Sequence, residues 1–363
     1  MPNPYSDLPD HCFWSRAHRV GHPGEVDPVV SGGFRVTPDT RIATAGSCFA
    51  QHLANHLQAD GYNYFVTEAA HPFLSDAAAR ALGYGMFSAR YGNIYTTRQL
   101  RQLLERAHGR FAPVEEMWHR DGAVFDPFRP NIQPEGFVNE AEFRGQRDIH
   151  FAAIRRMVAE MDVFVFTLGL TEAWISREDG AVFPLAPGVV AGTFDPARHA
   201  FHNFTVDEVV DDFRAAADLI RAINPDVRFL LTVSPVPLIA TAREDRSVIT
   251  STAYSKAVLR VAAETLERGV EGCHYFPSYE VITGNFNRGA YFADDLRDVR
   301  TEGVGHVMDL FMRHYTDTGA GTAPAQRPAS ARDDAARRFV EETTRELDVI
   351  CDEELIETGG RRR

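Results

Sequence analysis

The chain has 363 residues, of which 44% are apolar and 25% are charged, and its formal net charge is −13. This composition is typical of a globular protein with a sizeable core, and the length predicts about two domains or one elaborated domain. The acidic excess argues against a nucleic-acid partner, and no apolar run approaches the roughly 18 residues of a transmembrane helix, so we expect no membrane segment.

Residues 1–39 predict an N-terminal extension. They lack the charged and apolar regions of a signal peptide. The four cysteines of the chain show no CxxC pair and lie too far apart to indicate a zinc site or a disulfide framework. We therefore expect a reduced, cytoplasmic protein without a metal ion or cofactor.

Residues 40–315 alternate between short β-branched or aromatic runs and segments with apolar residues at helical spacing. The expected strands are Thr40–Ala45, Tyr62–Thr67, Asp162–Leu170, Val227–Val233 and Cys273–Tyr279. The expected helices run from Phe49 to Gly61 and over Thr97–Ala107, Glu140–Met161, Val206–Ile223, Ser251–Arg268 and Val304–Tyr315. Because strands separated by helices form parallel sheets with right-handed crossovers, we expect an α/β fold.

Three further segments differ from this pattern. Residues 109–136 are rich in Pro, Gly and aromatic residues, which predicts an insertion in the domain. Residues 316–331 have the composition of a flexible linker. Residues 332–363 are highly charged and predict a C-terminal helix and tail that is an interaction element or a solvated one.

The first candidate site lies at Gly46-Ser47, where a strand is expected to lead into a helix. In parallel α/β sheets ligands bind beyond the carboxyl ends of the strands, and a helix N-terminus favours developing negative charge. Ser47 is therefore either a nucleophile or a helix N-cap. Cys48 is a rival nucleophile whose simpler interpretation is a buried apolar side chain.

These motifs resemble the GSCFA family, which is grouped with the SGNH/GDSL hydrolases. The resemblance covers roughly residues 40–315 and rests on GSCFA at 46–50, YGNIYT at 91–96, DPFRP at 126–130, TLGLTE at 167–172, SPVP at 234–237, SK at 255–256 and FPSYE at 276–280. It implies a flavodoxin-like three-layer α/β/α sandwich with a parallel sheet, and it places Ser47 at the nucleophile position.

The chain differs from the SGNH enzymes at the residue that acts as the catalytic base. SGNH enzymes end with Asp-x-x-His, and here Asp295 matches the Asp whereas Asp298 stands at the position of the His. A carboxylate is a weak base towards a hydroxyl group. Three interpretations follow: His306 is the base, oriented by Asp295 or Asp298; His202 supplies the imidazole; or hydrolysis has been lost.

The oxyanion donors also depart from the family pattern. Within Gly169-Leu170-Thr171-Glu172, Thr171 stands where SGNH enzymes carry an Asn, and a hydroxyl group has a different reach from an amide. Asn93 or Asn203 could replace that amide. Gly92 and Ser47 could provide backbone N–H donors. The simpler interpretation of the Thr171-Glu172 segment is a strand-exit turn.

Three other residues are candidates for substrate binding. Lys256 is the single lysine among 38 basic residues, and it is expected on a helix behind the Ser234–Pro237 loop. It either binds a substrate anion or a carbonyl at the edge of the site, or it is a structural lysine with a buried stem. Arg129, in the insertion with Trp118, either belongs to a lid over an anionic or sugar-like substrate or lies in a self-packed loop.

Together these residues predict a serine esterase, acyl hydrolase or O-acyltransferase that acts on an O-acyl ester of a carbohydrate-like or small polar molecule. The alternative is an SGNH-fold binding or scaffold protein that has lost the catalytic His. Neither interpretation includes a metal ion, a cofactor, nucleic acid or a membrane.

Overall fold

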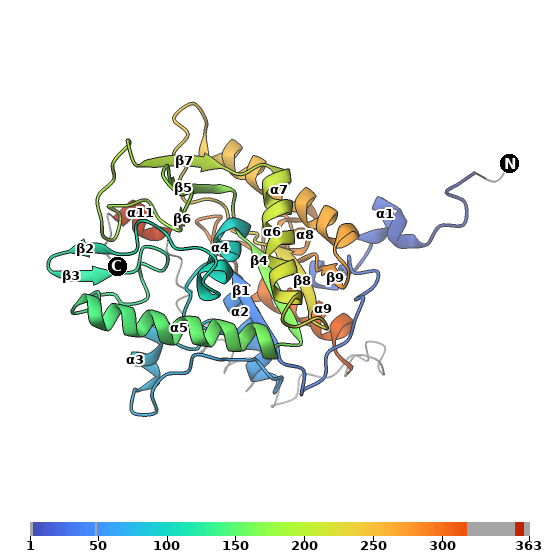
Figure 1. Ribbon diagram of the computed structural model, residues 1–363. Helices are drawn as coiled ribbons and strands as arrows, with labels where there is room; N and C mark the ends of the chain where they lie inside the picture. The colour runs from blue at the N-terminus through green and yellow to red at the C-terminus, as the bar shows by residue number, and fades with distance from the viewer. Residues whose placement is uncertain (1–2, 48, 318–352, 359–363) are drawn as a thin grey trace. The chain divides into compact units, whose positions relative to one another are not determined.

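The computed structural model describes residues 3–47, 49–317 and 353–358 (Figure 1). The chain forms two compact units. One comprises residues 38–275 and 350–363, and the other comprises residues 1–37 and 276–349.

The larger unit is built on a four-stranded parallel sheet with the strand order β1-β4-β8-β9. The strands are β1 (Ile42–Gly46), β4 (Val163–Leu168), β8 (Arg228–Val233) and β9 (Cys273–Tyr275). All residues of β1 and β4 are buried, as strands covered on both faces require. The predicted parallel α/β fold is confirmed.

The expected strand Tyr62–Thr67 is reduced to one parallel bridge between Ile42 and Tyr64. The reason is competition for backbone hydrogen bonds. Ser88 Oγ accepts the N–H of Thr44 at 3.0 Å, and Ser88 O accepts the N–H of Thr67 at 2.7 Å. Beyond the bridge at Ile42, the edge of β1 that faces away from β4 is therefore hydrogen-bonded to Ser88, and residues 65–67 cannot pair with it as a strand.

Helices cover both faces of the sheet. Helix α2 packs on β1 and β4, whereas α6 packs against α4 and α7, and α7 lies on β8 and β9. Phe213 of α6 contacts Phe166 and Phe229 on the sheet. Right-handed crossovers place α2 on the face opposite α6 and α7, which gives three layers. The helices of this unit are α2 (Phe49–Ala59), α3 (Asp76–Ala81), α4 (Thr97–Ala107), α5 (Glu140–Glu160), α6 (Val206–Arg221), α7 (Val248–Gly269) and α11 (Glu354–Thr358).

Two small antiparallel sheets were not expected from the sequence. The pair β2 (Trp118–Arg120) and β3 (Ala123–Phe125) lies within the insertion, and β6 (Val182–Phe183), β5 (Glu172–Ser176) and β7 (His199–Asn203) form a sheet in that order. Figure 1 shows α11 between β2 and β6. Leu355 of α11 is buried in a cluster with Trp118 and Phe183, so the C-terminal helix packs on these ribbons.

The smaller unit joins the two chain segments through Val36, whose N–H donates to Tyr315 O at 2.7 Å. Its elements are η1 (Asp10–Cys12), α1 (Trp14–Ala17), η2 (Pro23–Glu25), α8 (Ser278–Thr283), η3 (Asn285–Asn287) and α9 (Thr301–Tyr315). The expected strand to Tyr279 ends at Tyr275 because α8 begins at Ser278.

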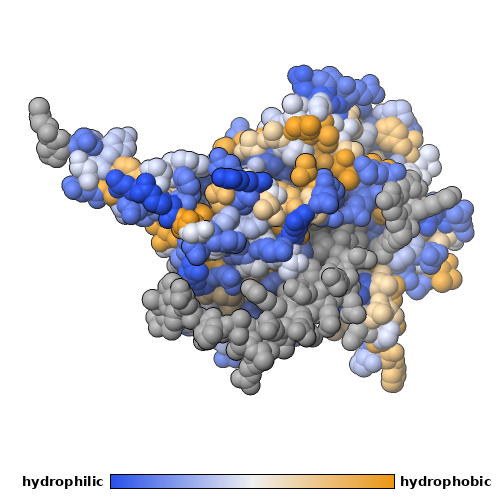
Figure 2. All heavy atoms as spheres, turned by 180° about the vertical axis from the view of Figure 1, so that it is seen from behind, coloured by the Kyte–Doolittle hydropathy of each residue, from blue (hydrophilic) through white to orange (hydrophobic). Residues whose placement is uncertain are grey.

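The predicted linker was expected to begin at residue 316, but Thr316 is buried and forms a parallel bridge with Val36. Residues 318–331 of the linker and most of the tail 332–363 lie outside the described residues. Within the described ranges, no helix combines the length and the apolar character needed to cross a bilayer. The large apolar side chains that remain exposed are scattered along the chain, and the face drawn in Figure 2 shows hydrophilic residues between its hydrophobic ones.

Candidate functional site

Ser47 follows the last residue of β1 and is only 3% exposed. Gly46 places it there with a φ of +132°, and a Cβ on Gly46 would lie 2.3 Å from Thr167 O. Only glycine can therefore bring β1 this close to β4 at that position. In the part of the chain that the structure describes, Ser47 Oγ has no hydrogen-bond partner.

Ser47 opens into a small pocket at the carboxyl ends of β1, β4 and β8, with an empty volume of about 230 Å³. We call it the Ser47 pocket. Gly169 packs closely on two other lining residues, because a Cβ there would lie 3.2 Å from Ser47 Cβ and 3.1 Å from the Tyr95 backbone. The lining residues are Ser47, Tyr95, Gly169, Leu170, Ser234, Val236, Pro237, Leu238, Lys256 and Glu353.

Lys256 reaches this pocket from α7 and is 3% exposed. Its ammonium group donates to Gly169 O at 2.7 Å, a carbonyl at the edge of the pocket. Gly169 therefore lies close to Ser47 and is hydrogen-bonded to Lys256. Glu353, immediately before α11, adds a carboxylate to the same lining.

Two of the candidate oxyanion donors, the Ser47 N–H and the Thr171 hydroxyl, have partners of their own, and so does the N–H of Gly169. The N–H of Ser47 donates to Thr167 O at 3.2 Å, and the N–H of Gly169 donates to Tyr95 O at 3.1 Å. The hydroxyl of Thr171 donates to Asn203 Oδ1 at 2.6 Å. These donors already hold the loops around the pocket in place.

The other candidate binding residues are spread over more than one site, and only Ser234 among the next four lines the Ser47 pocket. Glu172 accepts a hydrogen bond from Thr241 at 2.8 Å, and burial raises the pKa of its carboxyl group. Ser234 Oγ accepts from the N–H of Val236 at 3.3 Å inside the Ser47 pocket. Gly92 has a φ of +67°, and the buried Asn93 after it lines a second pocket.

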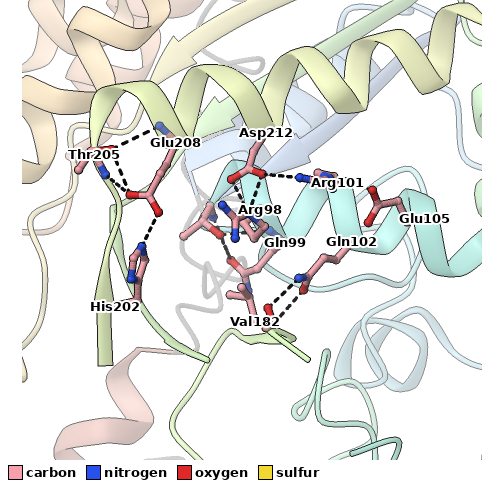
Figure 3. Close-up of polar contacts among 12 residues, drawn as sticks. Arg98, Gln99, Arg101, Gln102, Glu105, Val182, His202, Thr205, Glu208 and Asp212 are labelled. Carbon is pink, nitrogen blue, oxygen red and sulfur yellow. Dashed lines mark hydrogen bonds and ion pairs between the residues drawn. The ribbon is translucent and has the colours of Figure 1, made fainter. Parts of the chain in front are cut away.

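His202 extends from β7 towards α6, where its Nε2 lies 2.7 Å from Glu208 Oε1 (Figure 3). Glu208 also completes the capping box of α6 with Thr205. The ring of His202 packs edge-on against Phe204 at 4.5 Å between centroids. His202 is not part of the Ser47 pocket lining.

His306, Asp295 and Asp298 belong to the smaller unit. Both ring nitrogens of His306 have partners there: Nδ1 lies 2.9 Å from the Tyr291 hydroxyl and Nε2 lies 2.8 Å from Val26 O. Burial lowers the pKa of His306. Asp295 Oδ1 accepts the N–H of Asp298 at 3.1 Å, and the Asp298 side chain is 65% exposed.

The second pocket, which we call the His150 pocket, spans about 430 Å³, a volume that includes space open to solvent. It lies between α4, α5 and the insertion. Its polar lining includes Arg129 and Asn93 from the sequence analysis and four residues that were not expected, Arg106, Asp126, His150 and Gln102. Gln102 is bonded to Gly180 O and the N–H of Val182, which fixes β6 to α4 (Figure 3).

The His150 side chain that lines this pocket forms a buried pair with the carboxylate of Glu68. His150 Nδ1 lies 2.6 Å from Glu68 Oε2, which also accepts the N–H of Arg90 at 2.8 Å. Burial, with the nearby charge of Arg129, lowers the pKa of His150 to about 4. Burial is the largest single effect and opposes ionisation of Glu68, but the hydrogen bond and charge of His150, the charge of Arg129 and the N–H of Arg90 together outweigh it and lower the Glu68 pKa to about 2. The pair is a neutral imidazole on an ionised carboxylate at neutral pH.

Sequence reasoning missed Glu68 and His150 because neither lies in a motif. His150 is on the buried face of α5, where a histidine is usually structural, and its partner is 82 residues away. Across the described ranges, no group of three or more His, Cys, Asp or Glu side chains could hold a metal ion.

Comparison with known proteins gives one match. A model of the GSCFA family matches residues 41–311. No curated protein and no solved structure matches the chain.

Proposed function

The chain belongs to the GSCFA family, and we propose that it is an SGNH-type serine hydrolase or O-acyltransferase that acts on an O-acyl ester of a carbohydrate-like or small polar molecule. One observation carries this proposal. The buried Ser47 hydroxyl has no partner among the described residues, and it opens into the same pocket as the Lys256 ammonium group.

In the proposed reaction, Ser47 Oγ attacks the carbonyl carbon of the ester, and its proton passes to Lys256 Nζ in the neutral amine form. The ammonium group so formed stabilises the oxyanion by charge. When the C–O bond breaks, the leaving alcohol takes the proton back from Lys256. Water or an acceptor hydroxyl then resolves the acyl-enzyme by the same steps in reverse order.

We give the role of base to Lys256 because the alternatives are bonded elsewhere. Both nitrogens of His306 have partners, and His202 is paired with Glu208 outside the pocket lining. Lys256 instead lines the pocket of Ser47 and donates to the Gly169 carbonyl at its edge.

The second candidate is a binding protein that uses the same pocket without catalysis. One observation favours this binding function: the N–H groups of Ser47 and Gly169 already donate to the backbone carbonyls of Thr167 and Tyr95. A hydrolase that used either N–H for the oxyanion would have to break these bonds. The proposed location for either function is the cytoplasm, from the spacing of the cysteines.

Labelling with a fluorophosphonate separates the two candidates. We expect the wild-type protein to be labelled at Ser47, and Ser47→Ala to be unlabelled. Ser251→Ala is the matched control, because Ser251 is also buried with a hydroxyl that lacks a partner but does not line the pocket. Folded wild-type protein that takes up no label would exclude the hydrolase and favour the binding protein.

A further inference from the structure

The His150 pocket contains buried polar atoms without partners. Arg129 donates through Nε to Asp126 at 2.7 Å and through Nη1 to Arg90 O at 3.1 Å, but its Nη2 has no partner among the described residues. The same holds for His150 Nε2. Both side chains are at most 3% exposed. Buried polar groups of this kind normally have a partner, so each requires an explanation.

A third group in the pocket, the Arg106 guanidinium, is 3.7 Å from the centre of the Phe128 ring and 5.2 Å from that of Phe151. It forms no hydrogen bond or ion pair with any residue that the structure describes. Burial lowers its pKa to about 10, so it remains charged at neutral pH. A buried charge without a hydrogen bond destabilises a protein unless a ligand uses it.

The charges around the pocket do not balance. The nearby cations are Arg90, Arg106, Arg129 and Arg147. The nearby anions are Glu68, Asp126 and Glu116, and because Glu116 forms an ion pair with Arg147, one positive charge is left in excess. The guanidinium of Arg90 is already bonded to two backbone carbonyls and the Tyr84 hydroxyl. The excess charge is therefore available on the side of Arg106 and Arg129.

The protonation of His150 adds a second requirement. Because Glu68 is an ionised acceptor, the neutral imidazole must carry its proton on Nδ1 and donate it to Glu68. His150 Nε2 is then a hydrogen-bond acceptor without a partner among the described residues, on a side chain that lines the pocket. A simple anion would pair with the arginines but would not donate a hydrogen bond to His150 Nε2.

We infer that the His150 pocket binds a small 2-hydroxycarboxylate, whose carboxylate pairs with Arg106 and Arg129 and whose hydroxyl donates to His150 Nε2. Planar guanidinium groups match a carboxylate in geometry. The rings of Phe128 and Phe151, which line the pocket, provide apolar contact for a short carbon chain. This site does not depend on Ser47, which does not line it.

Lactate and propionate test the inference, because they differ only in the hydroxyl that His150 would receive. By calorimetry on the full chain, lactate should bind about tenfold or more tightly than propionate. Inorganic phosphate provides the third arm, since it has both a charge and an O–H donor but no carbon chain. Equal affinity for lactate and propionate, binding of none of the three, or phosphate binding as tight as lactate binding would overturn the assignment.

Arg106→Met identifies the site, since methionine keeps an apolar side chain beside Phe128 and removes the charge. It should abolish lactate binding and leave the melting temperature of the ligand-free protein unchanged or higher. Arg156→Met, at an exposed arginine of α5, is the control and should bind lactate normally. Unchanged lactate binding by Arg106→Met would overturn the inference.

A measurement on the wild-type protein covers the case in which the variant fails to fold. The ¹⁵N resonances of the histidine rings distinguish a protonated from an unprotonated nitrogen. His150 should have a protonated Nδ1 and an unprotonated Nε2, and only Nε2 should shift on lactate addition. A proton on Nε2, or no shift at saturation, would contradict the predicted acceptor.

Discussion

The buried Glu68–His150 pair predicts a specific loss of stability in mild acid. The unfolded chain protonates a histidine near the ordinary pKa of 6.5, whereas the folded protein leaves His150 neutral down to about 4. Between these values the unfolded state binds more protons, so stability falls as the pH is lowered. The slope for one group is about 1.4 kcal/mol per pH unit, and the full window of 2.5 units corresponds to about 3 kcal/mol.

His150→Gln isolates this contribution. Glutamine retains an N–H donor for Glu68 but cannot titrate, and the charge of Arg129 and the N–H of Arg90, which also lower the Glu68 pKa, remain in the variant. Urea unfolding at a series of pH values between 6.5 and 4.5 gives the two slopes. The wild-type slope should exceed that of the variant by about one proton, or about 1.4 kcal/mol per pH unit. Identical slopes would refute the neutral, buried state of His150.

Four further predictions follow from other parts of the fold. Gly46→Ala should lower the free energy of unfolding by about 3 kcal/mol in urea, because its Cβ overlaps Thr167 O, and wild-type stability would contradict that close approach. Thr205→Ala should lower it by about 1 kcal/mol through loss of the α6 capping box, and an unchanged urea midpoint would show that the cap contributes nothing. Lys256→Arg should slow fluorophosphonate labelling about tenfold or more, because a guanidinium cannot accept a proton, and full labelling would remove Lys256 as the base. Leu355→Ala should expose the α11 peptide to limited proteolysis, since a helix of one turn depends on its buried contact, and unaltered protection would place its anchor elsewhere.

The central sheet was predictable because its signals are local. The segments Asp162–Leu170 and Val227–Val233 are continuous apolar runs, and such runs are typical of strands buried on both faces. The sheet formed by β5, β6 and β7 has no such signal. In β7 only the first residue is buried, and its pairing with β5 depends on partners about 30 residues away, such as Ala173 with His202. Its strands are therefore specified by tertiary contacts rather than by their own pattern.

The two pockets also differ in how far the sequence predicts them. Ser47, Ser234 and Lys256 were assigned to one end of the sheet from strand-exit positions, and the structure places all three in one pocket. Their roles in catalysis stay predictions. His150 and Arg106 lie within regular helices, and the features that distinguish them are missing partners and an excess charge. Neither feature exists until α4, α5 and the insertion have packed together.

The segment 91–95 connects the two pockets through backbone bonds. Asn93 lines the His150 pocket and Tyr95 lines the Ser47 pocket, while the N–H of Ile94 between them donates to Gly46 O at 2.8 Å. The carbonyl of Tyr95 in turn accepts the N–H of Gly169. Since neither Gly46 nor Gly169 leaves room for a Cβ without displacing its neighbours, this network has little freedom to shift. The position of Ser47 and the shape of the His150 pocket are thus fixed by the same backbone hydrogen bonds, and a substitution at Gly46 should alter both lactate affinity and serine labelling.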